Sequence, residues 1–292
     1  MLSATIGWQP DWVDVLQAQF MRNAFLAGTI LCIAAGAVGF FVIVRRQAFA
    51  AHALAHIGFP GATAAVVAGV SVTLGLTVFC VLGSLAIGFL GRKAEERDVA
   101  TGTVLAFATG LGVLFASIAS GGAGTVTNVL FGNLLAVSTT QVVTFACFSA
   151  ILLGVIAWVA RPLAFASLQP EVAQARGVPV RTLSILFLVL LALVVVMAVE
   201  VVGTLLLFAL VVTPAATALS LTARPALIFA ASVAFGLLSV WSGLVLSAMF
   251  NLPPSFAIVT VATILWLASV VRAWSSDRGA AQAAAGARPA IR

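Results

Sequence analysis

The chain has 292 residues, of which 63% are hydrophobic and 8% are charged, and its mean hydropathy is +1.22. A soluble domain is about half apolar and about a quarter charged, so this composition excludes a cytosolic or secreted globular protein and, apart from the chain ends, a disordered one. The net charge of +6 comes from basic residues that stand singly or in pairs between apolar runs, which indicates membrane orientation and not nucleic-acid binding.

Apolar runs recur along the chain, and a helix that spans a bilayer needs roughly 20 such residues. A shorter run at 125–136 follows a glycine-rich stretch and is expected to be re-entrant or interfacial. We therefore expect an all-α polytopic membrane protein with about eight to ten membrane segments. The expected domains are an N-terminal extracytoplasmic or interfacial segment, a transmembrane domain and a flexible Ala/Gly-rich cytoplasmic tail: 1–20, 21–273 and 274–292. The long runs lie near 22–44, 48–69, 70–90, 99–120, 139–160, 179–199, 201–222, 225–249 and 255–271.

The basic residues predict the orientation, because lysine and arginine collect in cytoplasmic loops. With the N-terminus outside and the C-terminus inside, only Arg22 lies on the outer side. This arrangement requires a tight turn near Glu200 that separates two apolar runs. The inner side then carries Arg45, Arg46, Arg92, Lys93, Arg97, Arg161, Arg176, Arg181, Arg224, Arg272, Arg278, Arg288 and Arg292.

The chain contains only two histidines, His52 and His56, within a run that predicts a membrane helix. Residues four apart share a helix face, so both imidazoles can point into one space, and the small residues around them allow close approach of other backbone. Neutral imidazoles are natural ligands for a divalent cation such as zinc. The alternative is a pair of hydrogen-bonded packing histidines. Two imidazoles leave a tetrahedral site open, so acidic groups, water or the same pair from a second copy would complete it.

Glu200 is the exceptional acidic residue within the apolar regions. An intramembrane carboxylate is a candidate functional group by default, so Glu200 is a further candidate metal ligand. The predicted orientation places it near the outer face, away from the histidines, where a gate or an interfacial residue is the alternative.

A proline follows the histidine pair and another follows Glu200, and both predict interrupted helices. Gly58-Phe59-Pro60-Gly61 comes after the histidines, and Thr213-Pro214 lies within a later run. Proline frees backbone carbonyls, and broken helices of this kind recur near transport sites.

The longest inner connection, 161–181, predicts a short amphipathic helix from Glu171 to Arg176, with Pro170 at a favoured first position and Gly177 at its end. A helix placed there could dock a partner, and an ordinary connector is the alternative. The sequence has no phosphate-binding loop, no zinc-protease motif and no hydrolase motif. We therefore expect a translocation subunit without enzymatic activity, with any ATP hydrolysis on a separate partner.

Four stretches in order resemble the permease subunit of the manganese/zinc/iron-type ABC importers, the ABC-3 family. They are RRQAFAAHALAHIGFPGA from Arg45, LFGNLLAVS from Leu130, PEVAQARGVPVR from Pro170, and VGTLLLFALVVTPAATA from Val202 together with NLPPSFAIV from Asn251. The resemblance covers most of residues 20–272. It implies a type II importer fold in a bacterial inner membrane, and a homodimer with two cytoplasmic ATP-binding subunits and an extracytoplasmic metal-binding protein.

The resemblance also assigns residues. His56 occupies the family's histidine position in the metal path, and His52 stands where many members have aspartate. An added nitrogen ligand and a lost carboxylate favour zinc over manganese as the transported ion, with no permanently bound cofactor. The inner loop resembles the segment that docks the ATPase, here Pro170, Glu171, Ala175, Arg176 and Gly177.

The sequence thus predicts the permease of an ATP-driven importer of a divalent transition metal, most strongly zinc. A permease for manganese, iron or a metal chelate is the alternative within that class. From other classes, an ion-coupled secondary carrier and a purely structural membrane partner stay open. Partners other than proteins are membrane lipids and not nucleic acids.

Overall fold

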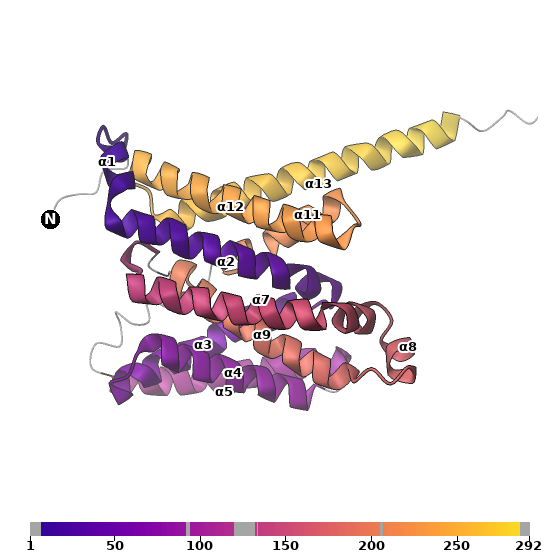
Figure 1. Ribbon diagram of the computed structural model, residues 1–292, viewed down its shortest axis with the longest axis horizontal. Coiled ribbons are helices and arrows are strands. Elements are labelled where there is room, and N and C mark those ends of the chain that lie inside the picture. Colours follow the sequence, from indigo (N-terminus) through magenta and orange to yellow (C-terminus); the bar gives the residue numbers. More distant parts are fainter. Residues whose placement is uncertain (1–6, 92–93, 120–131, 133, 205–206, 287–292) are drawn as a thin grey trace, which may run out of the picture.

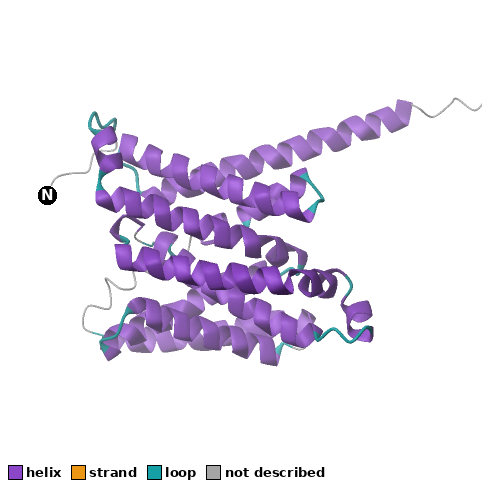
Figure 2. Cartoon of the chain, in the orientation of Figure 1, coloured by secondary structure: helices purple, strands orange, loops and turns teal. Residues whose placement is uncertain are grey.

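The computed structural model describes residues 7–91, 94–119, 132, 134–204 and 207–286. Every regular element in these ranges is helical, as Figures 1 and 2 show. The all-α expectation is therefore confirmed. The helices are α1 (Trp12–Gln17), α2 (Gln19–Val44), α3 (Ala48–Ala68), α4 (Val72–Leu90), α5 (Ala94–Ile118), η1 (Leu134–Ala136), α7 (Thr139–Leu168), α8 (Pro170–Ala175), α9 (Val180–Val202), α10 (Leu207–Val211), α11 (Thr213–Leu221), α12 (Pro225–Phe250) and α13 (Pro254–Gly286).

Eight helices in the described part of the chain are long and apolar enough to cross a membrane. They lie side by side in one bundle, with α12 and α13 on one side, α4 and α5 on the other, and α9 among the helices between them (Figure 1). Because α9 packs against α2, α3, α4 and α7, 72% of its most apolar window is buried within the protein. The eight candidate spans agree with the expected range.

The predicted span at 201–222 is present only as a shorter, divided helix. α9 continues to Val202, and the chain then turns at Gly203, which has a positive φ of 83°, so the predicted turn near Glu200 is confirmed. The following apolar helix, Leu207–Leu221, is short and is divided into α10 and α11. Pro214 sits in the first turn of α11, where its missing N–H costs nothing, so the predicted interruption at Thr213-Pro214 is confirmed.

The predicted break after the histidines is wrong, because α3 runs without interruption through Pro60. Proline lacks the N–H group that would bond to the His56 carbonyl oxygen four residues earlier. The packing of α4 and α5 against α3 supports the continuous helix. The Thr63 hydroxyl lies 3.2 Å from the carbonyl oxygen of Phe59 and 3.1 Å from that of Pro60, which ties it to the turn that contains the proline.

One boundary drawn from composition does not coincide with a helix end. α13 continues past residue 273 and reaches Gly286, beyond the other helices of the bundle (Figure 1). The alanine-rich sequence of that stretch has a high helix propensity, which explains the extension. The expected re-entrant run at 125–136 lies mostly outside the described residues, which include only the 3-10 turn η1 from it.

The bundle has two ends, the Glu200 end and the Arg45 end, each called after a residue that lies there. The Glu200 end contains the turn between α3 and α4, the first turn of α7 and the last turn of α9. The Arg45 end contains the turn between α2 and α3, helix α8 and the first turn of α9.

Small residues set the closest helix contact in the bundle. Gly61 of α3 and Gly75 of α4 face each other so closely that a Cβ atom added to either would overlap the backbone carbonyl of the other. Helices in lipid associate through such close packing, because no hydrophobic driving force distinguishes a neighbouring helix from the lipid tails. The glycine pair therefore holds α4 against the helix that carries the histidines.

Candidate functional site

The two histidines lie on one face of α3, as their spacing predicts. Their ring centroids are 4.8 Å apart, with the ring planes at 75°. Both side chains are half-buried, whereas the intervening Ala53, Leu54 and Ala55 are fully buried. One helix face therefore packs into the bundle, while the imidazoles occupy its less covered side.

Neither imidazole forms a hydrogen bond with any other residue that the structure describes. The alternative of hydrogen-bonded packing histidines is therefore not seen in this part of the chain. Their nitrogen lone pairs are free to act as ligands, and neutral imidazole nitrogen suits borderline divalent cations.

Glu200 belongs to a different part of the molecule. Within the described ranges no group of three or more His, Cys, Asp or Glu side chains is placed to hold a metal ion, so Glu200 does not join the two histidines. His52 and His56 lie four and eight residues into α3 from the Arg45 end, or about 6 and 12 Å along its axis. Glu200 lies in the last turn of α9, at the opposite end.

The Glu200 carboxylate is held by polar side chains from two other helices. Its Oε2 atom accepts a hydrogen bond of 3.3 Å from the side-chain amide of Gln141 on α7, and the Thr73 hydroxyl of α4 is a second donor. Its Oε1 atom is buried and has no hydrogen-bond partner among the described residues. Within this part of the chain, one oxygen of the carboxylate could therefore accept a further donor or bind a cation.

Gln141 also fixes the start of α7. The Ser138 backbone N–H donates to Oε1 of Gln141 over 2.9 Å, and the Ser138 hydroxyl accepts from the Gln141 backbone N–H over 3.2 Å, which completes a capping box. A cavity of about 460 Å³ opens beside this network, and threonines of α4 and α7 contribute polar groups to a largely apolar lining that includes Gln141 but not Glu200. The Glu200 end thus combines neutral oxygen groups with one carboxylate.

Arg45 ties together three helices at the other end. Its guanidinium donates to the Ser167 hydroxyl over 3.0 Å and also to the Ser184 hydroxyl, and it stacks over the Phe187 ring at 5.5 Å. Ser167 ends α7 immediately before α8, and Ser184 follows α8 at the start of α9. One side chain therefore joins both flanks of α8 to the turn that leads into the histidine helix.

Helix α8 forms where the sequence predicts it, within one residue. It runs from Pro170 to Ala175, and Gly177 follows with a positive φ of 79°. Ala173 is its buried residue, while Glu171, Ala175 and Arg176 are exposed. A short helix anchored on one side and exposed on the other presents a surface to a partner.

Sequence reasoning missed Gln141 and the contacts of Arg45. The pattern Ser-x-x-Gln at 138–141 is a capping-box signal that could have marked Gln141 as the first turn of a helix. Its contact with Glu200 spans 59 residues of sequence, and those of Arg45 with serines span 122 and 139, so no local pattern announces them.

A bundle of bilayer-length helices is typical of a membrane transport protein when one of its helices carries imidazoles that have no hydrogen-bond partner among the described residues. Residues 17–273 match the ABC 3 transport family. The chain belongs to this family, and the resemblance read from the sequence is confirmed.

Known relatives cover most of the chain. The manganese transport system membrane protein MntC of Halalkalibacterium halodurans is 32% identical over 254 residues, 87% of each chain. The manganese import system permease protein ScaB of Streptococcus parasanguinis is 31% identical over 261 residues, which is 89% of this chain and 93% of ScaB. The solved structure of PsaBC from Streptococcus pneumoniae in complex with Fab matches with a TM-score of 0.79 and 31% identity over 89% of this chain and 94% of its own.

Proposed function

We propose that this chain is the membrane-spanning permease subunit of an ATP-driven importer of a divalent transition metal ion. The observation that carries the proposal is the histidine pair, with rings 4.8 Å apart and no hydrogen-bond partner among the described residues. Polar groups inside a bilayer are costly and usually mark a pathway. The names of the relatives, which refer to manganese transport, support a metal as the cargo.

Zinc is the proposed cargo, because two imidazole nitrogens suit zinc better than manganese, which prefers carboxylate, carbonyl and water oxygens. Manganese is the second candidate, and the names of the relatives favour it. The two histidines are proposed as transient ligands. An incomplete ligand set lets the ion leave again, whereas a closed tetrahedral site would retain it.

Glu200 is proposed as a separate contact for the ion near the mouth of the pathway. Its Oε1 atom, which has no hydrogen-bond partner among the described residues, and the cavity beside Gln141 support this role. Carboxylate and hydroxyl oxygens bind a cation without the strength of a full nitrogen or sulfur cage, so an ion would pass on from here.

The proposed assembly contains two copies of this chain, two cytoplasmic ATP-binding subunits and an extracytoplasmic metal-binding protein, in a bacterial inner membrane. The half-covered histidine face supports the homodimer, because a second copy would supply two further imidazoles. The exposed residues of α8 support docking of the ATPase at the Arg45 end. This end is proposed to face the cytoplasm, which places the Glu200 end and the N-terminus outside.

The test is uptake of radioactive zinc and manganese by the reconstituted importer, each measured in competition with the other. His52→Ala combined with His56→Ala should abolish uptake while the protein still inserts and assembles. His52→Asp, which replaces nitrogen by carboxylate oxygen, should shift preference from zinc toward manganese by about tenfold. Thr103→Val, on the exposed side of α5, is the control. Unchanged uptake by the double alanine variant would refute the role of the pair, and manganese preference in the wild type would refute zinc.

A further inference from the structure

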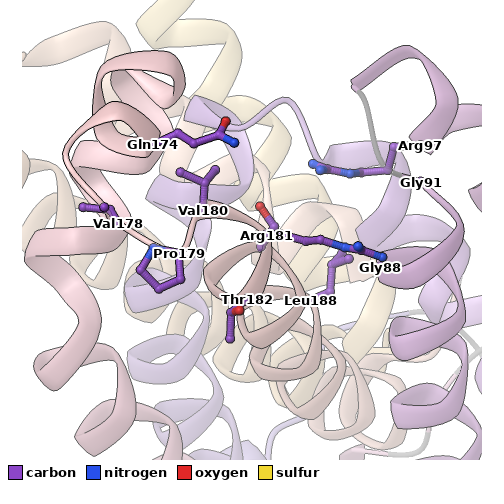
Figure 3. A pocket seen from close by; sticks show the side chains of 12 residues that line it. Gly88, Gly91, Arg97, Gln174, Val178, Pro179, Val180, Arg181, Thr182 and Leu188 are labelled. Carbon is purple, nitrogen blue, oxygen red and sulfur yellow. The ribbon is translucent and has the colours of Figure 1, made fainter.

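A second, unassigned cavity lies at the Arg45 end, apart from the histidines and from Glu200. It has a volume of about 550 Å³ and is formed by α4, α5, α8, α9 and the connection between α8 and α9. Figure 3 shows the guanidinium groups of Arg97 and Arg181 and the carboxamide of Gln174 projecting into it from three different elements. Its polar lining is therefore dominated by cationic groups.

Within the described residues, no carboxylate is placed in an ion pair with Arg97 or Arg181. The exposed Asp98, the chain neighbour of Arg97, acts on it electrostatically without such a contact. Arg45 lies close to Arg97. Burial, and to a smaller extent repulsion from Arg97, lowers the pKa of the Arg45 guanidinium to about 10. Arginine side chains therefore gather at and beside this cavity.

The cavity also offers hydrogen-bond donors without partners. The Nε atom of Arg97, which lines the cavity, is buried and has no hydrogen-bond partner among the described residues, and the same is true of the Nε atom of Arg45 behind the wall. Helix α9 begins at the cavity wall, and its N-cap, Pro179, provides no side-chain acceptor for the first-turn N–H groups. Unpaired buried donors and an uncapped N-terminus of a long helix both favour a bound oxyanion.

The position of the cavity identifies the kind of anion. The cavity lies where bilayer-length helices end, and its deeper wall is apolar, with Gly88 and Leu188. Phe89 and Leu90, at the end of α4 next to that wall, are exposed large hydrophobic side chains. A ligand that fits this cavity has a phosphate group, which lies at the level of the lipid head groups, and a hydrocarbon chain, which lies against the apolar wall. Basic pockets between spans on the cytoplasmic side bind anionic lipid head groups in this way.

We propose that this cavity binds the phosphate of an anionic phospholipid from the cytoplasmic leaflet, with Arg97 and Arg181 as its charged ligands and Gln174 as a neutral donor. A guanidinium group binds phosphate through two parallel hydrogen bonds, which a zwitterionic lipid would also accept. The positive charge of the cavity selects for the anionic lipid, because a choline group would add another cation. The bound lipid would contact α8 and α9 together, at the proposed ATPase-docking end.

The test is native mass spectrometry of the purified full-length permease after titration with phosphatidylglycerol, phosphatidylcholine or inorganic phosphate. Wild type should retain phosphatidylglycerol about tenfold more strongly than phosphatidylcholine. Arg97→Gln combined with Arg181→Gln should lose about tenfold in phosphatidylglycerol retention. Arg181→Gln alone changes an exposed residue, so the variant should fold and still lose several-fold. Arg224→Gln removes a charge that does not line the cavity and should leave retention unchanged.

Three results would overturn the proposal. Equal phosphatidylglycerol retention by wild type and by both cavity variants would show that the arginines do not bind lipid. Displacement of phosphatidylglycerol by inorganic phosphate at about 10 mM would show that the site takes a free anion and not a lipid. Loss of ATPase co-purification in the variants, with lipid retention intact, would show that the arginines serve protein docking.

Discussion

Helices α3 and α5 pack against each other, yet they differ sharply in how they are covered. In α3, 67% of the most apolar window is buried, against 22% in α5. The order of hydropathy is the reverse, since α3 is the least hydropathic of the eight candidate spans. Inside a membrane, therefore, apolar character does not decide which helix is central.

Residue size explains the difference. The histidine-bearing α3 is rich in alanine and glycine, so α4 and α5 approach it closely. α5 contributes a few contact points, such as Gly112 beneath the Phe59 ring, and exposes large residues including Phe107 and Val113. Three pairs of substitutions, in order of decreasing expected effect, test how α3 and its surroundings are held.

The largest effect is expected at the glycine contact of α3. Gly61→Ala places a methyl group against the backbone carbonyl of Gly75, which cannot move without separating α3 from α4. We expect a loss of about 3 kcal/mol in the free energy of unfolding, at the upper end of the usual cost of overpacking. Denaturation of the purified protein in detergent, followed by tryptophan fluorescence, measures it.

Gly110→Ala on α5 is the matched control, because an added Cβ atom meets nothing within 4 Å there. This change should stabilise the helix by no more than about 1 kcal/mol. Equal losses for the two variants would mean that close packing does not distinguish α3 from α5.

An intermediate effect is expected where the chain enters α3. Arg45→Gln removes the charged donor shared by Ser167 and Ser184 and the stacking over Phe187. Hydrogen bonds to charged groups contribute about 1.5–3 kcal/mol each, so a loss of about 2 kcal/mol is expected after the glutamine compensates in part. The stability of Arg45→Lys should lie between those of the wild type and Arg45→Gln, because lysine keeps the positive charge but lacks the planar guanidinium with its two parallel donors.

Thermal unfolding measures the stability of the Arg45 variants, and metal uptake by the reconstituted importer is a second measurement. Because Arg45 joins both flanks of α8 to the histidine helix, uptake should fall further than stability alone explains. Wild-type stability in Arg45→Gln would contradict the bridging role.

The smallest effect is expected from a pair of threonines. Thr63→Val on α3 removes a buried hydroxyl placed for the carbonyl oxygens of Phe59 and Pro60, at an expected cost of about 1 kcal/mol. Thr103→Val on α5 removes an exposed hydroxyl that donates to the Val99 carbonyl oxygen, and should change stability by less than about 0.5 kcal/mol. Hydrogen exchange of the α3 amides would locate the weakening, and a larger loss at Thr103 would reverse the contrast.

Features fixed by neighbouring residues could be predicted from the sequence. The limits of α8 follow from Pro170 and Gly177, and the shared face of the histidines follows from a four-residue spacing. The turn near Glu200 is predicted, but the segment after it is predicted as one full span from 201 to 222, because hydropathy averages over about 20 residues and does not show that the helix is short and divided.

Other features depend on partners distant in sequence. α3 continues through Pro60 because α4 and α5 pack against it, and that packing is not visible in a local pattern. The separation of Glu200 from the histidines likewise follows from how α9 lies against α3 and not from either segment alone.

Glutamine and glutamate serve equally well as the third residue of a capping box. At position 141 the protein uses glutamine, whose amide donates to the Glu200 carboxylate over 3.3 Å. A glutamate would start α7 just as well but would set two negative charges side by side in a poorly hydrated place. The identity of this helix-starting residue is therefore decided by a neighbour 59 positions away, so any redesign of the carboxylate must treat the two positions as one unit.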